Sequence, residues 1–129
     1  MAKKEVKVGR AYDPPAHGDG ARVLVDRIWP RGLTKVKAHL DEWCKDVAPS
    51  TELRKWYNHD PARFAEFTRR YHAELTEPGR SEALAHLREL AEDRTLTLLT
   101  ATKEPDISEA EVLAEMLRHL MESEERPNA

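Results

Sequence analysis

Charged and hydroxyl-bearing side chains gather at two places where an apolar run of the chain ends. The run at 23–25 leads into a segment with an aspartate, two arginines, a tryptophan and a glycine, and the run at 95–100 leads into a threonine and a lysine. Arginine presents a planar fork to carboxylate or phosphate groups, lysine presents a point charge, and threonine hydroxyls fill the remaining acceptor sites. These side chains predict a site for a small anionic or nucleotide-like ligand. The predicted ligand-binding residues are Asp26, Arg27, Trp29, Arg31, Gly32, Thr100, Thr102 and Lys103.

The two segments form one site only if the strands before them are neighbours. Val23-Leu24-Val25 is apolar at successive positions, which is typical of a strand that is covered on both faces. The segment 95–100 is short and rich in β-formers, and it predicts a second buried strand. Ligands gather beyond the carboxyl ends of parallel strands, so neighbouring strands would bring both segments to one crevice.

The rest of the pattern predicts further strands and a series of helices. Polar and apolar residues alternate over residues 5–9, which predicts an edge strand, whereas Leu40–Trp43 predicts a short strand or an irregular crossing. The prolines and glycines of residues 12–20 predict a loop. Helices are predicted to begin at Ser50 or Thr51, at Asp60-Pro61, at Ser81, and at Ser108, where Glu111 completes the spacing of a capping box.

Strands separated by helical segments predict an α/β fold, because parallel neighbours need a long crossover connection. We expect a small three-layer Rossmann-like domain, with a mostly parallel sheet and helices packed on it. A chain of 129 residues with 40% hydrophobic content suits one compact domain. Residues 1–121 are its predicted extent, and the charged residues 122–129 are predicted to be a frayed tail.

The charge balance and the cysteine count narrow the class of protein. The chain has 21 basic and 24 acidic residues, so it shows no overall basic footprint for nucleic acid, which leaves only a local basic patch open. The single cysteine, Cys44, excludes an internal disulfide and fits a reducing compartment. No apolar run approaches the roughly 20 residues that span a bilayer. We therefore expect a cytoplasmic protein with no membrane partner, and nothing in the sequence predicts its oligomeric state.

The histidines and the cysteine form no recognisable metal or nucleophile motif. None of the six histidines has a close ligand pair, so we expect no metal and no cofactor. Only His59 stays a candidate, because it joins two predicted helices within a polar cluster. If the crevice is catalytic, we expect hydrolysis or group transfer, with Asp26 as base or orienter, His59 as proton carrier and Arg31 stabilising negative charge.

Other interpretations of the same residues stay open at this point. Asp26 and Arg27 could pair with each other at the strand end, and Trp29 could belong to the core or a lid. In a third hypothesis, exposed aromatic side chains form a patch that binds another protein. Its members would be Trp29, Trp43, Trp56 and Tyr57.

Three segments together resemble a known family. They are 22–32, which contains a Trp-Pro-Arg-Gly element, Leu40–Trp43, and 49–54. They are similar to the YeaO-like branch of the domain-of-unknown-function family numbered 488, and the likeness runs from about Val8 to Leu120. The resemblance implies a compact α/β bacterial protein whose biochemical role is not established. It also implies an aspartate and an arginine after the first buried strand, which Asp26 and Arg27 match.

The chain departs from the wider family at two places that matter for chemistry. Many members end their last strand with a cysteine, a small residue and a glutamate, where this chain has Thr100-Ala101-Thr102. They then carry Cys-His-Arg at the start of the final helix, where this chain has Ser108-Glu109-Ala110. A hydroxyl still hydrogen-bonds a ligand, but without an adjacent base it is a poor nucleophile. The resemblance therefore favours binding over catalysis.

Overall fold

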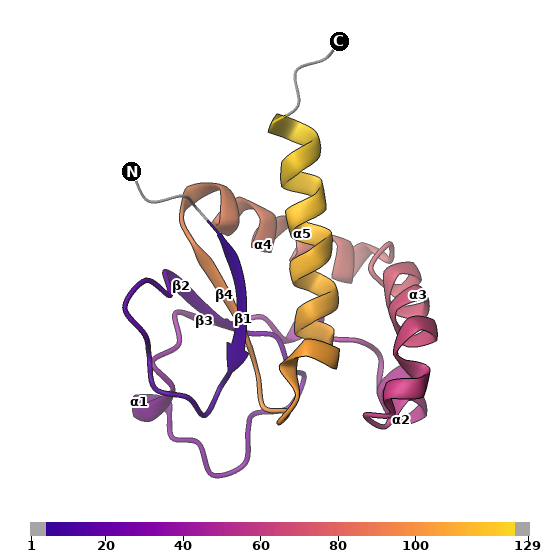
Figure 1. Cartoon of the computed structure of the whole chain (residues 1–129), viewed down its shortest axis with the longest axis horizontal. Coiled ribbons are helices and arrows are strands. Elements are labelled where there is room, and N and C mark those ends of the chain that lie inside the picture. Colours follow the sequence, from indigo (N-terminus) through magenta and orange to yellow (C-terminus); the bar gives the residue numbers. More distant parts are fainter. Residues whose placement is uncertain (1–4, 126–129) are drawn as a thin grey trace.

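The computed structural model describes residues 5–125, in which one sheet of four parallel strands is covered by helices (Figure 1). The strand order is β1-β4-β2-β3. The strands are β1 (Val6–Arg10), β2 (Ala21–Leu24), β3 (Glu42–Trp43) and β4 (Leu96–Thr100). The predicted α/β fold with a parallel sheet is confirmed, and β1 lies at an edge as the alternation over residues 5–9 predicts.

The strands that precede the two polar segments are neighbours. Val23 of β2 pairs with Leu98 of β4, and Leu24 pairs with Leu99. The pairing continues past the end of β2, since the Val25 N–H donates to the Leu99 carbonyl oxygen at 3.0 Å. The chain therefore leaves β2 and β4 side by side at the same edge of the sheet.

The helices begin close to the residues whose side chains cap them. Ser50 Oγ accepts the Leu53 N–H at 3.1 Å, and Asp60 Oδ1 accepts the Ala62 N–H at 3.0 Å, so both predicted starts are confirmed. The α-helices are α1 (Lys35–Ala38), α2 (Thr51–Tyr57), α3 (Phe64–Glu74), α4 (Pro78–Asp93) and α5 (Glu109–Glu125). Short 3-10 turns lie at η1 (Lys45–Val47), η2 (Pro61–Arg63) and η3 (Pro105–Ile107).

Three details of the helices differ from the predictions. The start at Ser81 is wrong: α4 begins at Pro78, because proline fits the first helical turn, where its missing N–H has no partner to lose. The capping box is only half formed, since Ser108 Oγ accepts the Ala110 N–H while Glu111 faces Arg118 at 3.6 Å. Helix α5 continues past residue 121 to Glu125, so residues 122–125 of the predicted tail are helical, and residues 126–129 lie outside the described part.

Successive side chains along each strand point to opposite faces of the sheet. The two faces are covered unequally. Leu98 faces the main core, which α2, α3, α4 and α5 close. Leu99 faces the other side, where it packs with Leu24 and Ala11 in a small cluster. Trp29, Leu33 and Leu40 cover that cluster. All three belong to the connection between β2 and β3, so this connection forms the thin third layer.

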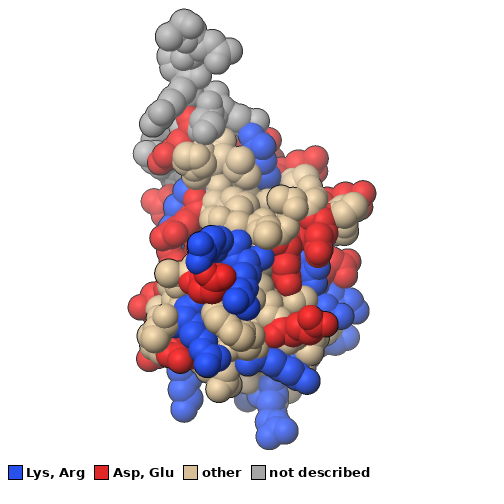
Figure 2. Space-filling view, turned by 90° about the vertical axis from the view of Figure 1, so that its right-hand side faces the viewer, with Lys and Arg blue, Asp and Glu red and all other residues tan. Residues whose placement is uncertain are grey.

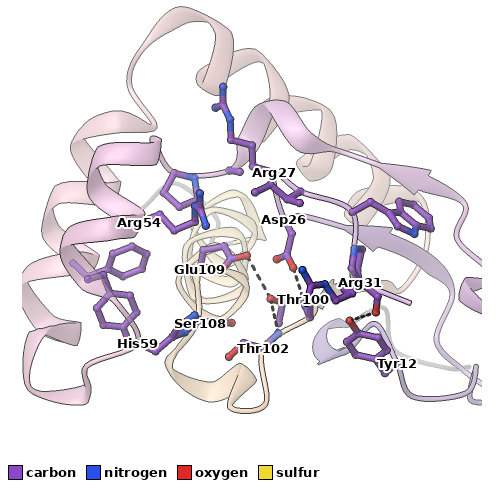
Figure 3. A pocket seen from close by; sticks show the side chains of 18 residues that line it. Tyr12, Asp26, Arg27, Arg31, Arg54, His59, Thr100, Thr102, Ser108 and Glu109 are labelled. Atoms are coloured by element: carbon purple, nitrogen blue, oxygen red, sulfur yellow. Dashed lines mark hydrogen bonds between the residues drawn. The ribbon is translucent and has the colours of Figure 1, made fainter. Parts of the chain in front are cut away.

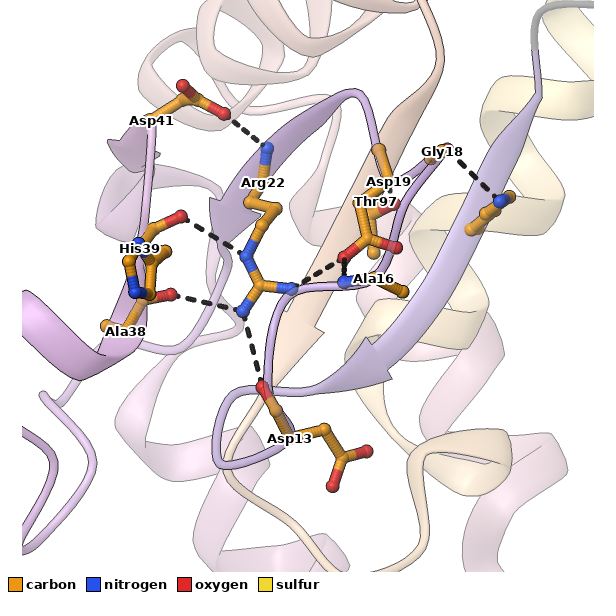
Figure 4. Close-up of polar contacts among 10 residues, drawn as sticks. Asp13, Ala16, Gly18, Asp19, Arg22, Ala38, His39, Asp41 and Thr97 are labelled. Carbon is orange, nitrogen blue, oxygen red and sulfur yellow. Dashed lines mark hydrogen bonds and ion pairs between the residues drawn. The ribbon is translucent and has the colours of Figure 1, made fainter.

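A buried arginine at the start of β2 connects the β1–β2 loop to the residues at the end of α1 (Figure 4). Arg22 is 6% exposed, and its Nη1 lies 2.7 Å from Asp19 Oδ2. Its other guanidinium N–H groups donate to the carbonyl oxygens of Asp13, Ala38 and His39. We call this set of residues the Arg22 clamp. It holds the β1–β2 loop against the end of α1.

The outer surface carries charge of both signs. Basic and acidic side chains both occur over the face on which α2 and α3 lie (Figure 2). No single large patch of one sign covers this face.

Between residues 5 and 125, no helix is both long enough and apolar enough to cross a membrane.

Candidate functional site

A pocket of about 450 Å³ opens at the carboxyl edge of the sheet, where β2 and β4 end (Figure 3). Its volume lies within the range of about 300–1,000 Å³ that is typical of small-molecule sites. Five parts of the chain contribute: the loops after β1, β2 and α2, the residues around α2 and α3, and the turn from β4 into α5. The lining residues are Tyr12, Asp26, Arg27, Ile28, Trp29, Pro30, Arg31, Ala48, Pro49, Arg54, Tyr57, His59, Phe67, Thr100, Ala101, Thr102, Ser108 and Glu109.

Most residues of the predicted site lie around this pocket. They are Asp26, Arg27, Trp29, Arg31, His59, Thr100 and Thr102. Two others do not line it. Gly32 lies in a turn with φ +78°, and Lys103 is exposed beyond the end of β4. Whether any of these residues binds a ligand stays a prediction.

Two carboxyl groups face each other in the pocket (Figure 3). Asp26 Oδ2 accepts the Ala101 N–H at 2.8 Å, and Glu109 Oε1 accepts the Thr100 hydroxyl at 3.5 Å. Burial raises the pKa of Glu109 well above its usual value, and the neighbouring Asp26 carboxyl raises it further. The Glu109 carboxyl therefore favours its protonated form.

Two arginines flank the carboxyl pair. Arg31 and Arg54 lie on either side of it, whereas Arg27 extends away from it (Figure 3). All three side chains belong to exposed residues. Among residues 5–125, no acidic group lies within 4.0 Å of any of these three guanidinium groups. The local ion pair between Asp26 and Arg27, one of the alternatives above, is therefore not formed.

The aromatic part of the lining is held rigidly. Tyr57 stacks on Phe67 with ring centroids 4.3 Å apart, and its hydroxyl donates to the Ile107 carbonyl oxygen at 2.6 Å. Burial and then the charge of Glu104 raise the pKa of Tyr57 to about 12, so the phenol stays protonated. Trp29 Nε1 donates to the Leu33 carbonyl oxygen at 2.7 Å. These rings shape the pocket wall rather than move within it.

The same contacts correct the hypothesis of an exposed aromatic patch. Tyr57 is only 5% exposed, so it cannot contact a protein partner. Trp56 is partly buried and lies under Arg70, whose guanidinium carbon is 4.1 Å from the ring centroid. Trp29 packs edge-on against Trp43 at 5.4 Å, which leaves Trp43 at 36% exposure as the most accessible of the four.

An unusual backbone conformation places His59 at the pocket. Asn58 and His59 have φ values of 45° and 53°, so two successive residues without a glycine adopt the left-handed region. The Asn58 N–H donates to the Arg54 carbonyl oxygen, which ends α2. Left-handed conformations of residues such as histidine are uncommon and often mark sites where a side chain is positioned for function.

Metal and thiolate chemistry find no support at this pocket. Within the described part of the chain, no group of three or more histidine, cysteine, aspartate or glutamate side chains could hold a metal ion. Cys44 is buried outside the pocket, and burial followed by the charge of Glu42 raises the pKa of its thiol to about 11. A thiol with that pKa is not a nucleophile at neutral pH.

Sequence reasoning missed Arg54 and Glu109, which matter most for the charge of the pocket. Glu109 stands in the first turn of a helix, where an acidic residue is ordinary because it suits the helix dipole. Arg54 stands on the helical stretch after the Ser50 cap, where a basic residue is equally ordinary. Neither residue carries a local signal, because each reaches the site only through tertiary packing.

Fold and pocket together define a class: small α/β domains with a polar pocket at the carboxyl edge of a parallel sheet. Within that class, the chain belongs to the family described as "Inactive DUF488-N3 subclade", whose model matches residues 5–129. The family resemblance predicted from the Trp-Pro-Arg-Gly element is thereby confirmed.

Relatives of similar length bear names without an activity. The chain is 51% identical over 117 residues to the uncharacterised protein Rv3073c of Mycobacterium tuberculosis, covering 91% of this chain and 97% of that one. It is 42% identical over 115 residues to the uncharacterised protein YeaO of Escherichia coli, covering 89% and 98% respectively. No solved structure matches the chain significantly.

Proposed function

We propose that the pocket binds a small anionic or nucleotide-like ligand, whose negative charge is held by Arg31 and Arg54. The observation that carries this proposal is that both guanidinium groups flank the pocket without an acidic partner in the described chain. A guanidinium group donates up to five hydrogen bonds in a planar fork that matches phosphate or carboxylate. Arg27 also lines the pocket, but its side chain extends away from the carboxyl groups.

The hydroxyl groups of this pocket are not activated as nucleophiles, which favours binding without turnover. Ser108 Oγ donates to the Pro105 carbonyl oxygen at 2.6 Å, so its proton is not held by a base. The Thr100 hydroxyl donates to Glu109 Oε1 at 3.5 Å, on a carboxyl group that favours its protonated form. The family description as inactive points the same way.

A charge-removal experiment tests the proposal. The unmodified protein is titrated by calorimetry with inorganic phosphate and adenosine monophosphate, after a thermal-shift screen of phosphorylated metabolites. We expect the double variant Arg31→Ala/Arg54→Ala to bind at least about tenfold more weakly, because charge-assisted hydrogen bonds contribute about 1.5–3 kcal/mol each. The matched control is Arg69→Ala, which removes a charge from the outer face of α3. Equal loss in the control, or unchanged affinity in the double variant, would contradict the proposal.

One observation favours a second function, hydrolysis or group transfer in the same pocket. Asp26 and Glu109 line the same pocket, and the raised pKa of Glu109 suits that carboxyl to act as a general acid. His59 lines the same pocket and would carry a proton. Turnover of a phosphorylated substrate that Asp26→Asn abolishes would establish this function. Turnover that survives Asp26→Asn and Arg31→Ala together would place the reaction elsewhere.

A further inference from the structure

The side chains at the inner end of the pocket differ in charge from those at its mouth. We call Asp26, Glu109 and Thr100 the acidic floor, and Arg31 and Arg54 the basic rim. Thr100 is 2% exposed and both carboxyl-bearing residues are partly buried, whereas both rim residues are exposed. A ligand that fills the pocket therefore meets carboxyl groups at one end and guanidinium groups at the other.

The floor has unused capacity for hydrogen bonds. Asp26 accepts one N–H, from Ala101, and Glu109 accepts one long hydrogen bond, from Thr100. Each carboxyl group offers about four acceptor positions, so the contacts within the protein use only part of them. A group that donates hydrogen bonds from within the pocket would satisfy the rest.

The two carboxyl groups line one pocket, and their protonation decides which donor fits. Burial and the neighbouring Asp26 raise the pKa of Glu109, so this carboxyl favours its protonated form and the pair presents a donor as well as acceptors. An ammonium group offers only donors, and it gains most from two ionised carboxylates. A hydroxyl both donates and accepts, so adjacent hydroxyls match a protonated carboxyl pair.

We propose that the acidic floor binds adjacent sugar hydroxyls of a phosphorylated ligand, while the basic rim holds its phosphate. This inference rests on the proposed function and narrows its ligand to a sugar phosphate, either free or within a ribonucleotide. A volume of about 450 Å³ accommodates a ligand of either kind. The Asp26 and Glu109 carboxyls then act as specificity determinants, and Arg31 and Arg54 provide most of the affinity.

Pairs of ligands that differ in one hydroxyl test this on the unmodified protein, so the result does not depend on any variant. The pairs are ribose 5-phosphate with 2-deoxyribose 5-phosphate, and adenosine monophosphate with its 2′-deoxy form. We expect each ribose ligand to bind about tenfold more tightly than its deoxy partner, the loss expected for one hydrogen bond to a charged or protonated carboxyl pair. Adenosine monophosphate binding more tightly than ribose 5-phosphate identifies a nucleotide, and the reverse identifies a free sugar phosphate.

The Glu109→Leu variant assigns the discrimination to the floor. Leucine keeps much of the volume but removes the carboxyl group, so we expect the ribose preference to fall below twofold. Affinity for inorganic phosphate, which occupies only the rim, should stay within twofold. The matched control is Glu111→Leu, on the same helix but outside the pocket lining. Glu109→Gln is the variant to use if Glu109→Leu does not fold, and it should reduce the preference in the same direction.

The outcomes separate this inference from the proposed function. If phosphorylated sugars bind but show no preference for ribose, the inference is overturned and the proposed function stands. A preference that persists in both Glu109 variants also overturns it, because another part of the pocket then recognises the hydroxyl. If inorganic phosphate, sugar phosphates and nucleotides all fail to bind, both fail together.

Discussion

Arg22 lies at the start of β2 and Arg31 follows the same strand, yet their surroundings are opposite. The guanidinium group of Arg22 is enclosed by the Asp19 carboxylate and by three carbonyl oxygens. That of Arg31 faces a pocket and has no acidic partner in the described chain. An arginine with all three guanidinium nitrogens hydrogen-bonded within the protein holds the fold together. An arginine whose donors are available contributes little to stability and can bind a ligand.

Replacement of Arg22 should therefore have the largest effect on stability. Arg22→Met removes the positive partner of the Asp19 carboxylate, which has 14% side-chain exposure, and the guanidinium donor of three carbonyl oxygens. Loss of one partner of a buried ion pair costs about 3–5 kcal/mol. We expect that decrease in the free energy of unfolding, measured by urea denaturation.

The pocket arginines provide the matched control. Arg31→Ala and Arg54→Ala should change the free energy of unfolding by no more than about 0.5 kcal/mol, as exposed side chains without partners usually do. A loss of several kcal/mol in either one would show that the rim is structural, and the contrast with the Arg22 clamp would disappear.

Replacement of a glycine should also lower the stability more near the Arg22 clamp than in the loop of the pocket. Gly20, close to the Arg22 clamp, has φ +64°, and an added Cβ would lie 2.0 Å from the Thr95 carbonyl oxygen. That oxygen cannot move freely, because it accepts the Ala21 N–H at 2.8 Å. We expect Gly20→Ala to cost more than about 3 kcal/mol, since the steric clash adds to the left-handed strain.

Gly32, in the loop of the pocket, also has a positive φ, but the space around it is open. It has φ +78° with no atom within 4 Å of an added Cβ, so Gly32→Ala should cost only the strain, about 1–2 kcal/mol. Thermal or urea unfolding of both variants measures the difference. Equal losses would mean that the Thr95 segment shifts to admit the methyl group.

The fold was predictable because its signals are local. An apolar run at 23–25 and β-formers at 95–100 define the central strands, and Ser50 and Asp60 mark helix starts with their own side chains. The order of the strands carries no such signal, since β4 inserts between β1 and β2 although it comes last. That placement depends on how well the buried strand packs under the helices.

The candidate site was predictable only where it is contiguous in sequence. Asp26 and Arg31 follow a buried strand and were expected at the sheet edge, where the pocket lies. Glu109 reaches Asp26 across more than eighty residues of chain, and its position in a helical first turn looks ordinary. Lys103 shows the opposite error, because a charge close to a strand end lies outside the pocket lining once the chain turns away.

The two regions should also respond to pH in opposite directions. Burial, with the nearby Asp26, raises the pKa of Glu109, so its contribution to stability is greatest below 4.5 and falls as pH rises through the raised pKa. The stability of Glu109→Gln relative to the unmodified protein should therefore increase from pH 5 to pH 8, by at most about 1.4 kcal/mol per pH unit for one proton. Urea denaturation across this range measures it.

The controls for this pH effect lie outside the pocket. Glu115→Gln, at an exposed position of the same helix, makes the same chemical substitution away from the pocket and is the matched control. Asp19 should behave in the reverse sense: burial raises its pKa, but the Ala16 N–H and Arg22 together lower it below 3.8. The stabilisation from Asp19 is therefore present above 3.8 and lost as pH falls through the lowered value. A constant difference between Glu109→Gln and the unmodified protein would contradict the raised pKa of Glu109.

The smallest expected effect concerns Lys103, which separates position in the sequence from position in the pocket. Lys103 and Arg31 both follow strands that end at the same edge, but only Arg31 lines the pocket. We expect Lys103→Ala to change phosphate affinity less than twofold, whereas Arg31→Ala alone should lower it severalfold. Because both substitutions remove one positive charge, a long-range field would weaken binding equally in both. A larger loss in Lys103→Ala would mean that the loop after Thr102 closes over the bound ligand, and the rim would then have to include it.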